Sequence, residues 1–214
     1  MMNMARPKKQ ENRRHEMVAA ATAAIAQRGL TGLRIKDVAQ EAGLSAGLVS
    51  YYYPSMEDLL LEVHEAAVDR FYRRRLDAVR ECSDPVERLY RTVRLGIPDT
   101  ADDPLCVVLY ELHVHASRNP RHSVLMTTLF DLEVSLYTTA LEIGRSHGAF
   151  TFTASADEIA RTAVGLEDAF GLHIVARNRR ISAIGARNSV LGYLEAMLGC
   201  RLGDFDAAES TAMS

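Results

Sequence analysis

Cysteine is scarce in this chain of 214 residues, and long uninterrupted apolar runs are absent. The three cysteines are Cys82, Cys106 and Cys200, and none of them stands in a CxxC pair. This number and spacing predict neither a disulfide framework nor a thiolate metal site, so buried free thiols are expected. The apolar stretches are broken well short of the roughly 20 residues that cross a bilayer, which predicts that no segment spans a membrane. The apolar stretch after the basic N-terminus contains Glu16 and Gln27, which is not typical of a secretory signal, and we expect a cytoplasmic location.

Lysine is also rare, and its three occurrences, at positions 8, 9 and 36, all fall in the N-terminal quarter of the chain. Residues 1–56 carry eight Lys or Arg against four Asp or Glu, whereas the remaining residues carry 17 against 24. The formal net charge of −3 therefore conceals a basic N-terminal part. A basic tail at residues 1–9 suits the phosphates of a nucleic acid, although a solvated, solubilising terminus is the commoner reason for such a run.

Apolar residues recur with helical spacing along most of the chain. With Gly, Pro and capping residues as boundaries, the spacing predicts helices over residues 12–28, 35–42, 46–52, 56–81, 85–97, 103–118, 121–147, 156–178 and 182–199. Residues 149–153 are locally strand-like but have no convincing pairing partner. The chain is therefore predicted to be all-α.

The segment Ile35–Val49 has the spacing of a helix-turn-helix. Gly43 can adopt the left-handed conformation that the turn requires, and Ser45 can cap the second helix by accepting a bond from a backbone amide. The two helices are expected to cross around a small core formed by Val38, Ala39, Leu44 and Val49. The N-terminus of the second helix then projects from the body of the protein, where it can enter a major groove about 12 Å wide.

This segment, with its continuation Val49-Ser50-Tyr51-Tyr52-Tyr53-Pro54-Ser55-Met56-Glu57-Asp58-Leu59-Leu60, resembles the DNA-binding domain of TetR-family transcriptional regulators. The resemblance covers about residues 12–60. It implies an all-helical homodimer in which residues 1–56 form a three-helix DNA-binding domain. Residues 57–214 would form a helical ligand-binding and dimerisation domain. The implied function is that of a regulator, most simply a repressor that a small molecule releases from its operator.

The resemblance also assigns DNA contacts to particular residues. Those placed at or near base edges are Lys36, Ala46, Gly47, Leu48 and Ser50. Those placed on backbone phosphates are Arg34, Ser45, Tyr51 and Tyr52, whereas Tyr53 is expected in the core. Two positions depart from the family pattern: Met56 replaces a phosphate-binding lysine, and Arg34 replaces a capping threonine.

A small-molecule cavity in the second domain would need a lining that mixes apolar and polar-tipped side chains. Candidates on presumed inner helix faces are Tyr90, Tyr110, His113, Met126, Phe130, Tyr137, Phe170 and His173. Each of them could instead be an ordinary core residue. Four acidic residues on the same helices leave open a cationic ligand held by a carboxylate and tyrosine faces. These are Glu111, Glu133, Glu167 and Asp168.

The last two predicted helices carry more apolar residues than one packing face requires. These residues are Ile159, Val164, Leu166, Phe170, Ile174, Ile184, Val190, Leu191, Leu194 and Leu198. In the resembled family the equivalent helices form a four-helix dimer interface, so a homodimer is expected through these two helices.

Other motifs do not support a catalytic or metal-binding reading. Gly43–Gly47 fits the GxSxG pattern, but the preceding residues are predicted helical and too polar for the buried strand of a nucleophile elbow. His113 and His115 diverge by about 200° on a helix, so the pair does not predict a metal site. Neither a Walker loop nor GxGxxG occurs, so nucleotide chemistry has no support. With the resemblance to transcriptional regulators, we expect no cofactor and no enzymatic activity. The alternative is a helical-bundle enzyme or small-molecule binding module that does not bind DNA.

Overall fold

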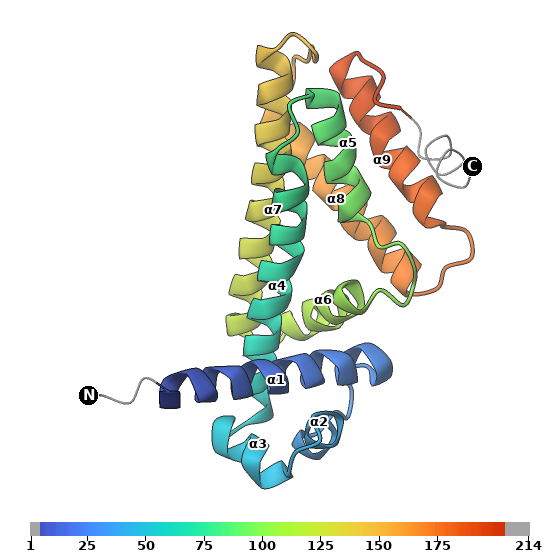
Figure 1. Ribbon diagram of the computed structural model, residues 1–214. Coiled ribbons are helices and arrows are strands. Elements are labelled where there is room, and N and C mark those ends of the chain that lie inside the picture. Colours follow the sequence, from blue (N-terminus) through green and yellow to red (C-terminus); the bar gives the residue numbers. More distant parts are fainter. Residues whose placement is uncertain (1–4, 204–214) are drawn as a thin grey trace, which may run out of the picture. The chain divides into compact units, whose positions relative to one another are not determined.

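The computed structural model describes residues 5–203, with side chains described from residue 10 onward (Figure 1). Within this range the secondary structure is entirely helical, which confirms the all-α prediction. The helices are α1 (Ala5–Arg28), α2 (Ile35–Glu41), α3 (Ala46–Tyr52), α4 (Met56–Arg80), α5 (Pro85–Gly96), α6 (Pro104–Ala116), α7 (Pro120–Ser146), α8 (Ala156–Val175) and α9 (Ala183–Leu198).

The predicted boundaries differ appreciably from the structure at one end, the start of α1. This helix begins at Ala5 rather than near residue 12, so Arg6–Lys9 lies in a helix and not in a flexible tail. Pro7 is no obstacle because proline is tolerated in the first turn of a helix, and the residues that follow are good helix formers. The rest of the predicted tail, residues 1–4, lies outside the described residues. The strand-like stretch 149–153 forms a loop.

The chain divides into two compact units, and α4 and α7 contribute residues to both. Unit 1 comprises residues 1–69 and 102–126, and unit 2 comprises residues 70–101 and 127–214. Among the described residues, unit 1 holds α1, α2, α3, α6 and the first parts of α4 and α7. Unit 2 holds the remaining parts of those two helices with α5, α8 and α9. The predicted division after residue 56 separates the domains by function, whereas these units are defined by compactness, so that division stays a prediction.

In unit 1, α1 packs against α2 and α6, and α2 packs against α3. The apolar stripe of α1 supplies Met17, Ala21, Ala24 and Ile25, all fully buried. Val38, Ala39 and Val49 are buried as the helix-turn-helix pattern predicts, while Leu44 in the turn is only half-buried. The predicted burial of Tyr53 is confirmed.

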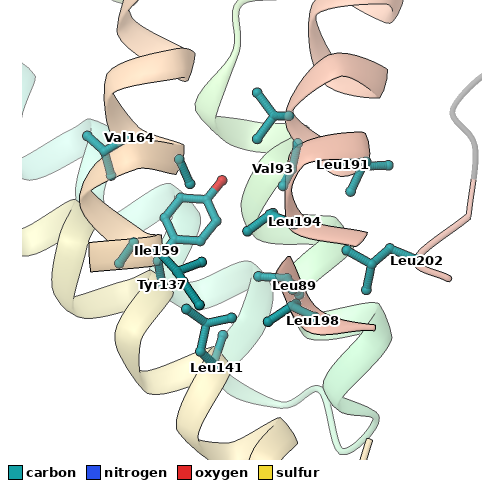
Figure 2. Close-up of a cluster of buried hydrophobic side chains, with 14 of the residues drawn as sticks. Leu89, Val93, Tyr137, Leu141, Ile159, Val164, Leu191, Leu194, Leu198 and Leu202 are labelled. Atoms are coloured by element: carbon teal, nitrogen blue, oxygen red, sulfur yellow. The ribbon is translucent and has the colours of Figure 1, made fainter. Parts of the chain in front are cut away.

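The core of unit 2 is formed by side chains from α5, α7, α8 and α9 and the segment after α9 (Figure 2). The labelled members are Leu89, Val93, Tyr137, Leu141, Ile159, Val164, Leu191, Leu194, Leu198 and Leu202. Each fully buried aliphatic side chain contributes about 1.5–3 kcal/mol, so this cluster is a principal source of the unit's stability.

This core corrects the argument from which the dimer was predicted. Most of the apolar residues assigned to a dimer interface are buried within one chain: Ile159, Val164, Ile174, Val190, Leu191, Leu194 and Leu198. The other three, Leu166, Phe170 and Ile184, are partly buried against the same cluster. The apolar residues of α8 and α9 are buried within the chain because these two helices pack against each other and both pack against α5.

By length and composition alone, α7 is apolar enough to cross a membrane, which the sequence prediction did not register. Its apolar residues have another explanation, since Val134, Tyr137, Ala140 and Leu141 belong to the core of unit 2. The helix also buries the ionisable residue Glu133. A helix that contributes to the core of a soluble protein can pass the same test, so α7 alone is weak evidence for a span.

The cysteine prediction is confirmed for two of the three residues. Cys82 and Cys106 are buried and form no disulfide bond, whereas Cys200 is half-buried.

Candidate nucleic-acid interface and buried polar groups

The start of α2 is capped from inside the helix. The carboxylate of Asp37 accepts a hydrogen bond from the backbone N–H of Arg34 at 2.9 Å. Arg34 therefore does not serve as a cap itself, and its side chain is exposed. Lys36, two residues later, is exposed as well. Two of the predicted DNA contacts thus lie at the solvent-facing start of α2.

The turn between α2 and α3 is tight because Gly43 has a φ of +64°. The backbone N–H of Leu44 donates to the carbonyl of Ala39 at 2.8 Å, which fixes the turn. Ser45 Oγ then accepts a hydrogen bond from the N–H of Leu48 at 3.2 Å and caps α3. The residues before Ser45 are helical rather than a strand, so its surroundings are not those of a nucleophile elbow.

The two sides of α3 differ in exposure and size. Val49 and the following Tyr53 are fully buried. The exposed residues are Ser45, Ala46, Gly47, Ser50 and Tyr51, and Leu48 and Tyr52 are half-buried. Apart from Tyr51, which is 74% exposed, this face is built from small side chains. A helix of such a profile can approach the floor of a groove closely, with hydroxyl groups available at its rim.

The basic residues near the middle of α1 are partly engaged within the chain. Arg13 Nη1 lies 2.6 Å from a carboxylate oxygen of Glu16. Arg14 pairs with Glu62 of α4, and its guanidinium lies 4.7 Å from the centroid of the Tyr53 ring. Burial raises the pKa of Tyr53, so this phenol stays neutral. Arg14 thus holds α1 to the segment after α3.

The structure divides the predicted ligand residues between the two units. Tyr110, His113 and Met126 belong to unit 1, whereas Tyr90, Phe130, Tyr137, Phe170 and His173 belong to unit 2. Tyr90, Phe130 and Phe170 pack against the core cluster that contains Tyr137. His113 and His173 are exposed. The eight residues are thus distributed over both units, and a ligand role for any of them stays a prediction.

The carboxylates that left a cationic ligand open already hold a cation from the chain itself. Arg75 of α4 is fully buried, and its Nη1 lies 2.6 Å from Glu133 Oε1 while its Nη2 lies 2.9 Å from Glu167 Oε2. The guanidinium carbon is 5.6 Å from the ring centroids of both Phe71 and Tyr137. This arrangement of carboxylates and aromatic faces is the type that binds organic cations, and here Arg75 occupies it.

The remaining acidic candidates are also accounted for. In unit 1, Glu111 Oε2 accepts a hydrogen bond from the N–H of Leu30 at 3.0 Å, so it serves the loop after α1. Asp168 contributes electrostatically to the Arg75 cluster, where it raises the pKa of Glu133. Burial is the largest cause that raises the pKa of Glu133 to about 8 and that of Glu167 to about 7.

The two histidines of α6 point apart, as their spacing predicts. His113 is exposed, whereas His115 is half-buried and its Nε2 lies 3.1 Å from a carboxylate oxygen of Glu57. His122 of α7 approaches the other oxygen of the same carboxylate. The sequence reasoning missed this grouping because it compared only histidines that are neighbours in the chain.

Three comparisons with known proteins agree with the helix-turn-helix geometry. Residues 17–63 match the family model described as bacterial regulatory proteins of the tetR family. The HTH-type transcriptional repressor KstR2 of Mycobacterium tuberculosis strain H37Rv is 32% identical over 78 residues, which cover 36% of this chain and 39% of KstR2. The HTH-type transcriptional regulator YfiR of Bacillus subtilis is 27% identical over 161 residues, 74% of this chain and 78% of YfiR.

One solved structure extends the likeness over most of the chain. A transcriptional regulator from Saccharomonospora viridis, crystallised in complex with choline, superposes with a TM-score of 0.79 at 26% identity. The match covers 86% of this chain and 96% of that protein. The family model and the named relatives agree that residues 17–63 are similar to bacterial regulatory proteins of the tetR family, and the chain as a whole resembles the S. viridis regulator in fold.

Proposed function

We propose that this protein is a ligand-responsive transcriptional regulator, most simply a repressor, that binds double-stranded operator DNA as a homodimer and has no catalytic activity. Its place of action would be the cytoplasm, where bacterial operator DNA is accessible. The observation that carries the proposal is the exposed face of α3, the helix capped by Ser45. This face consists mainly of small residues, and Lys36 at the start of α2 is exposed as well. The match with KstR2, which is named a transcriptional repressor, covers only 39% of the length of that protein.

The chemistry of the exposed residues suits both parts of DNA recognition. Lysine donates to O6 and N7 of guanine, and the side chains of Ala46 and Leu48 can contact thymine methyl groups. Arg34 and the hydroxyl of Tyr52 can donate to phosphate oxygens, which positions the protein without reading sequence. Met56 replaces a lysine that would add a further phosphate contact. We therefore assign base reading to Lys36 and the start of α3.

We base the proposed dimer on exposed residues, because most of the apolar residues from which it was predicted are buried within one chain. On α9, the residues Gly185, Ser189, Gly192 and Ala196 are all exposed and small, and their spacing puts them along one side of the helix. On α8, Gly165, Ala169 and Leu172 form a similar exposed line, and Leu172 is 50% exposed. Small side chains allow helices of two copies to approach closely, so we propose that these lines meet in the homodimer.

Unit 2 is the proposed sensor of a small molecule. The S. viridis protein was crystallised with choline, but in this chain Arg75 fills the carboxylate and aromatic site in which such a cation could bind. A ligand of this protein must therefore use other groups or displace Arg75. We expect any inducing ligand to weaken operator binding by its differential affinity for two states, a coupling of about 1–3 kcal/mol.

The proposal is tested by measuring the binding of labelled DNA from the region flanking the protein's own gene, with a scrambled duplex for comparison. Wild-type protein is expected to prefer the flanking DNA, and Lys36→Ala should lose about 1–3 kcal/mol of that preference. Tyr52→Phe should instead weaken both duplexes about equally, because a phosphate bond carries no sequence information. Arg91→Ala removes a positive charge from the exposed side of α5 and serves as the control.

The outcomes separate the DNA-binding proposal from its alternative. If wild-type protein binds neither duplex while remaining folded, the protein is a binding module or an enzyme rather than a DNA-binding regulator. If Lys36→Ala loses both duplexes in the same proportion, Lys36 contacts phosphate and not a base. A mass near 24 kDa by light scattering at micromolar concentration would refute the homodimer.

A further inference from the structure

Three side chains that are distant in the sequence converge within unit 1. They are Glu57 at the start of α4, His115 near the end of α6 and His122 in the first turn of α7. The Nε2 atom of His115 lies 3.1 Å from Glu57 Oε2, and the Nε2 atom of His122 lies 2.9 Å from Glu57 Oε1. One ligand atom from each residue lies within 4.8 Å of the other two. This is a compact set of two imidazoles and one carboxylate.

The environment of His122 gives an independent indication that something binds there. Its side chain is fully buried, yet its Nε2 makes no hydrogen bond, because its short approach to Glu57 is not aligned as one. An unpaired buried nitrogen costs about 1–3 kcal/mol. This nitrogen is also one of the three ligand atoms that lie within 4.8 Å of one another, which is the kind of grouping that can surround an ion. Binding an ion would remove the unpaired nitrogen.

The other ring nitrogen of His122 is already oriented for this role. His122 Nδ1 lies 2.9 Å from Nδ1 of His64, which is also fully buried. A contact between two such nitrogens requires one of them to carry a proton. If His122 donates from Nδ1, its Nε2 is left with a lone pair, which is the tautomer that metal ligation requires. Metal-bound histidines characteristically donate their second N–H to a neighbouring acceptor in this way.

The carboxylate has similar support. The side-chain amide of Asn119 donates a hydrogen bond to Glu57 Oε1, which orients the carboxylate. The side chains of His115 and Glu57 are 30% and 35% exposed, so an ion and a water molecule can reach the site from solvent. A set of two histidines and one glutamate with an open position is a known zinc arrangement. Bonds of about 2.0–2.1 Å place tetrahedral ligand atoms roughly 3.3 Å apart, so ligand atoms that already lie within 4.8 Å of one another need only a small adjustment to bind one ion.

We propose that Glu57, His115 and His122 bind one divalent transition-metal ion, with zinc as the expected occupant and water as the fourth ligand. His64 and Asn119 are positioning residues that orient His122 and Glu57. The absence of thiolates and the presence of two imidazoles favour zinc, nickel, cobalt or copper over magnesium and calcium, which prefer oxygen ligands. The prediction from sequence that the protein has no metal site is thereby replaced by a proposal. It does not depend on DNA binding.

The test uses full-length protein without a polyhistidine tag, stripped with EDTA and exchanged into chelator-free buffer. Isothermal titration with zinc chloride is expected to give one site per chain. Titration with cobalt chloride should produce the visible absorption bands of a four-coordinate cobalt ion. Zinc should also raise the melting temperature, because the complete ligand set exists only in the folded protein.

Two variants and one matched control assign the ligands. His115→Ala and Glu57→Gln change half-buried residues and should lower the zinc affinity at least about 100-fold, since each removes one of three protein ligands. His113→Ala removes an exposed histidine of the same helix and should leave affinity within about twofold. The melting temperature of each metal-free variant shows that it folds, which keeps the comparison valid.

Two results would overturn the proposal. One is the absence of a zinc site of micromolar affinity or better in folded wild-type protein. The other is equal zinc affinity of His115→Ala and His113→Ala, which would place the ion elsewhere. Loss of the cobalt bands in His115→Ala together with their retention in His113→Ala supports the assigned ligands, whatever the outcome of the DNA-binding experiment.

Discussion

Replacing Glu133 by glutamine should change how the stability of this protein depends on pH. Arg75 lies between two buried carboxylates, and only one of them is well supplied with hydrogen bonds. Glu167 accepts from Nη2 of Arg75 at 2.9 and 3.1 Å and from the hydroxyl of Tyr137 at 2.5 Å. The hydrogen bond found for Glu133 among the described residues comes from Nη1 of Arg75, at 2.6 Å. We therefore expect Glu167 to be ionised at neutral pH and Glu133 to retain a proton.

The direction in which stability changes with pH follows from the pKa of Glu133. Burial raises this pKa to about 8, with further raising effects from Asp168 and Glu167 and a lowering effect from Arg75. Below about pH 4.5 the carboxyl group is protonated in both the folded and the unfolded states. Between pH 4.5 and 8 the folded state holds a proton that the unfolded state has released. Stability therefore falls as pH rises through this window, by at most about 1.4 kcal/mol per pH unit for one proton.

Glutamine resembles the protonated acid and cannot ionise, so Glu133→Gln should remove this loss. Urea denaturation at half-unit intervals from pH 5 to pH 8 measures the effect as the difference between variant and wild type. The difference should grow in favour of the variant as pH rises. Glu142→Gln, which replaces a half-buried glutamate of the same helix, should run parallel to wild type. Parallel curves for Glu133→Gln and wild type would refute the proton assignment.

Three further predictions concern packing, capping and thiol access. Gly96→Ala should destabilise the protein by about 1–3 kcal/mol in urea denaturation, because the new Cβ would lie 2.1 Å from Glu167 Oε1. Gly47→Ala should not destabilise it, because the added methyl group has open space, and equal effects of the two substitutions would refute the clash. Ser45→Ala should cost about 1 kcal/mol through loss of the α3 cap while Ser50→Ala should not, and a reversed order would contradict the capping role. Titration of native protein with a thiol reagent should modify Cys200 first, since the other two cysteines are buried; fast reaction of all three would show that they are accessible.

Local signals in the sequence were sufficient to predict the helices. Each helix from α2 onward has a boundary residue with a local mechanism, such as Ser45, Asp84, Asp103, Ser155 or Ser182 at the N-cap. Such caps act over two or three residues, so the chain order alone reveals them. The start of α1 was placed too late because the apolar periodicity that marked the helix begins after its first, polar turns.

Burial within the helix-turn-helix was predictable for the same reason, and the use of apolar residues in α8 and α9 was not. A helical stripe shows that a face will be buried but not whether the partner is the same chain or another copy. Ile159 and Leu194 satisfy either reading of the sequence, and the structure assigns both to the core of unit 2. The proposed dimer relies instead on the exposed small residues of α8 and α9, which apolar periodicity does not detect.

The buried polar groups depend on pairings that no local pattern records. His64 and His122 are 58 positions apart, and so are Arg75 and Glu133. Within each of α4 and α7 the two members are 11 residues apart, which is close to three helical turns and puts them on the same side of the helix. Each pair depends on which residues of α4 and α7 face each other within its own unit, and a single sequence contains no signal for that pairing. Once the pairing is known, the partners of Arg75 in unit 2 and of His122 in unit 1 are identified, and the ligand and metal proposals become arguments about chemistry rather than about spacing.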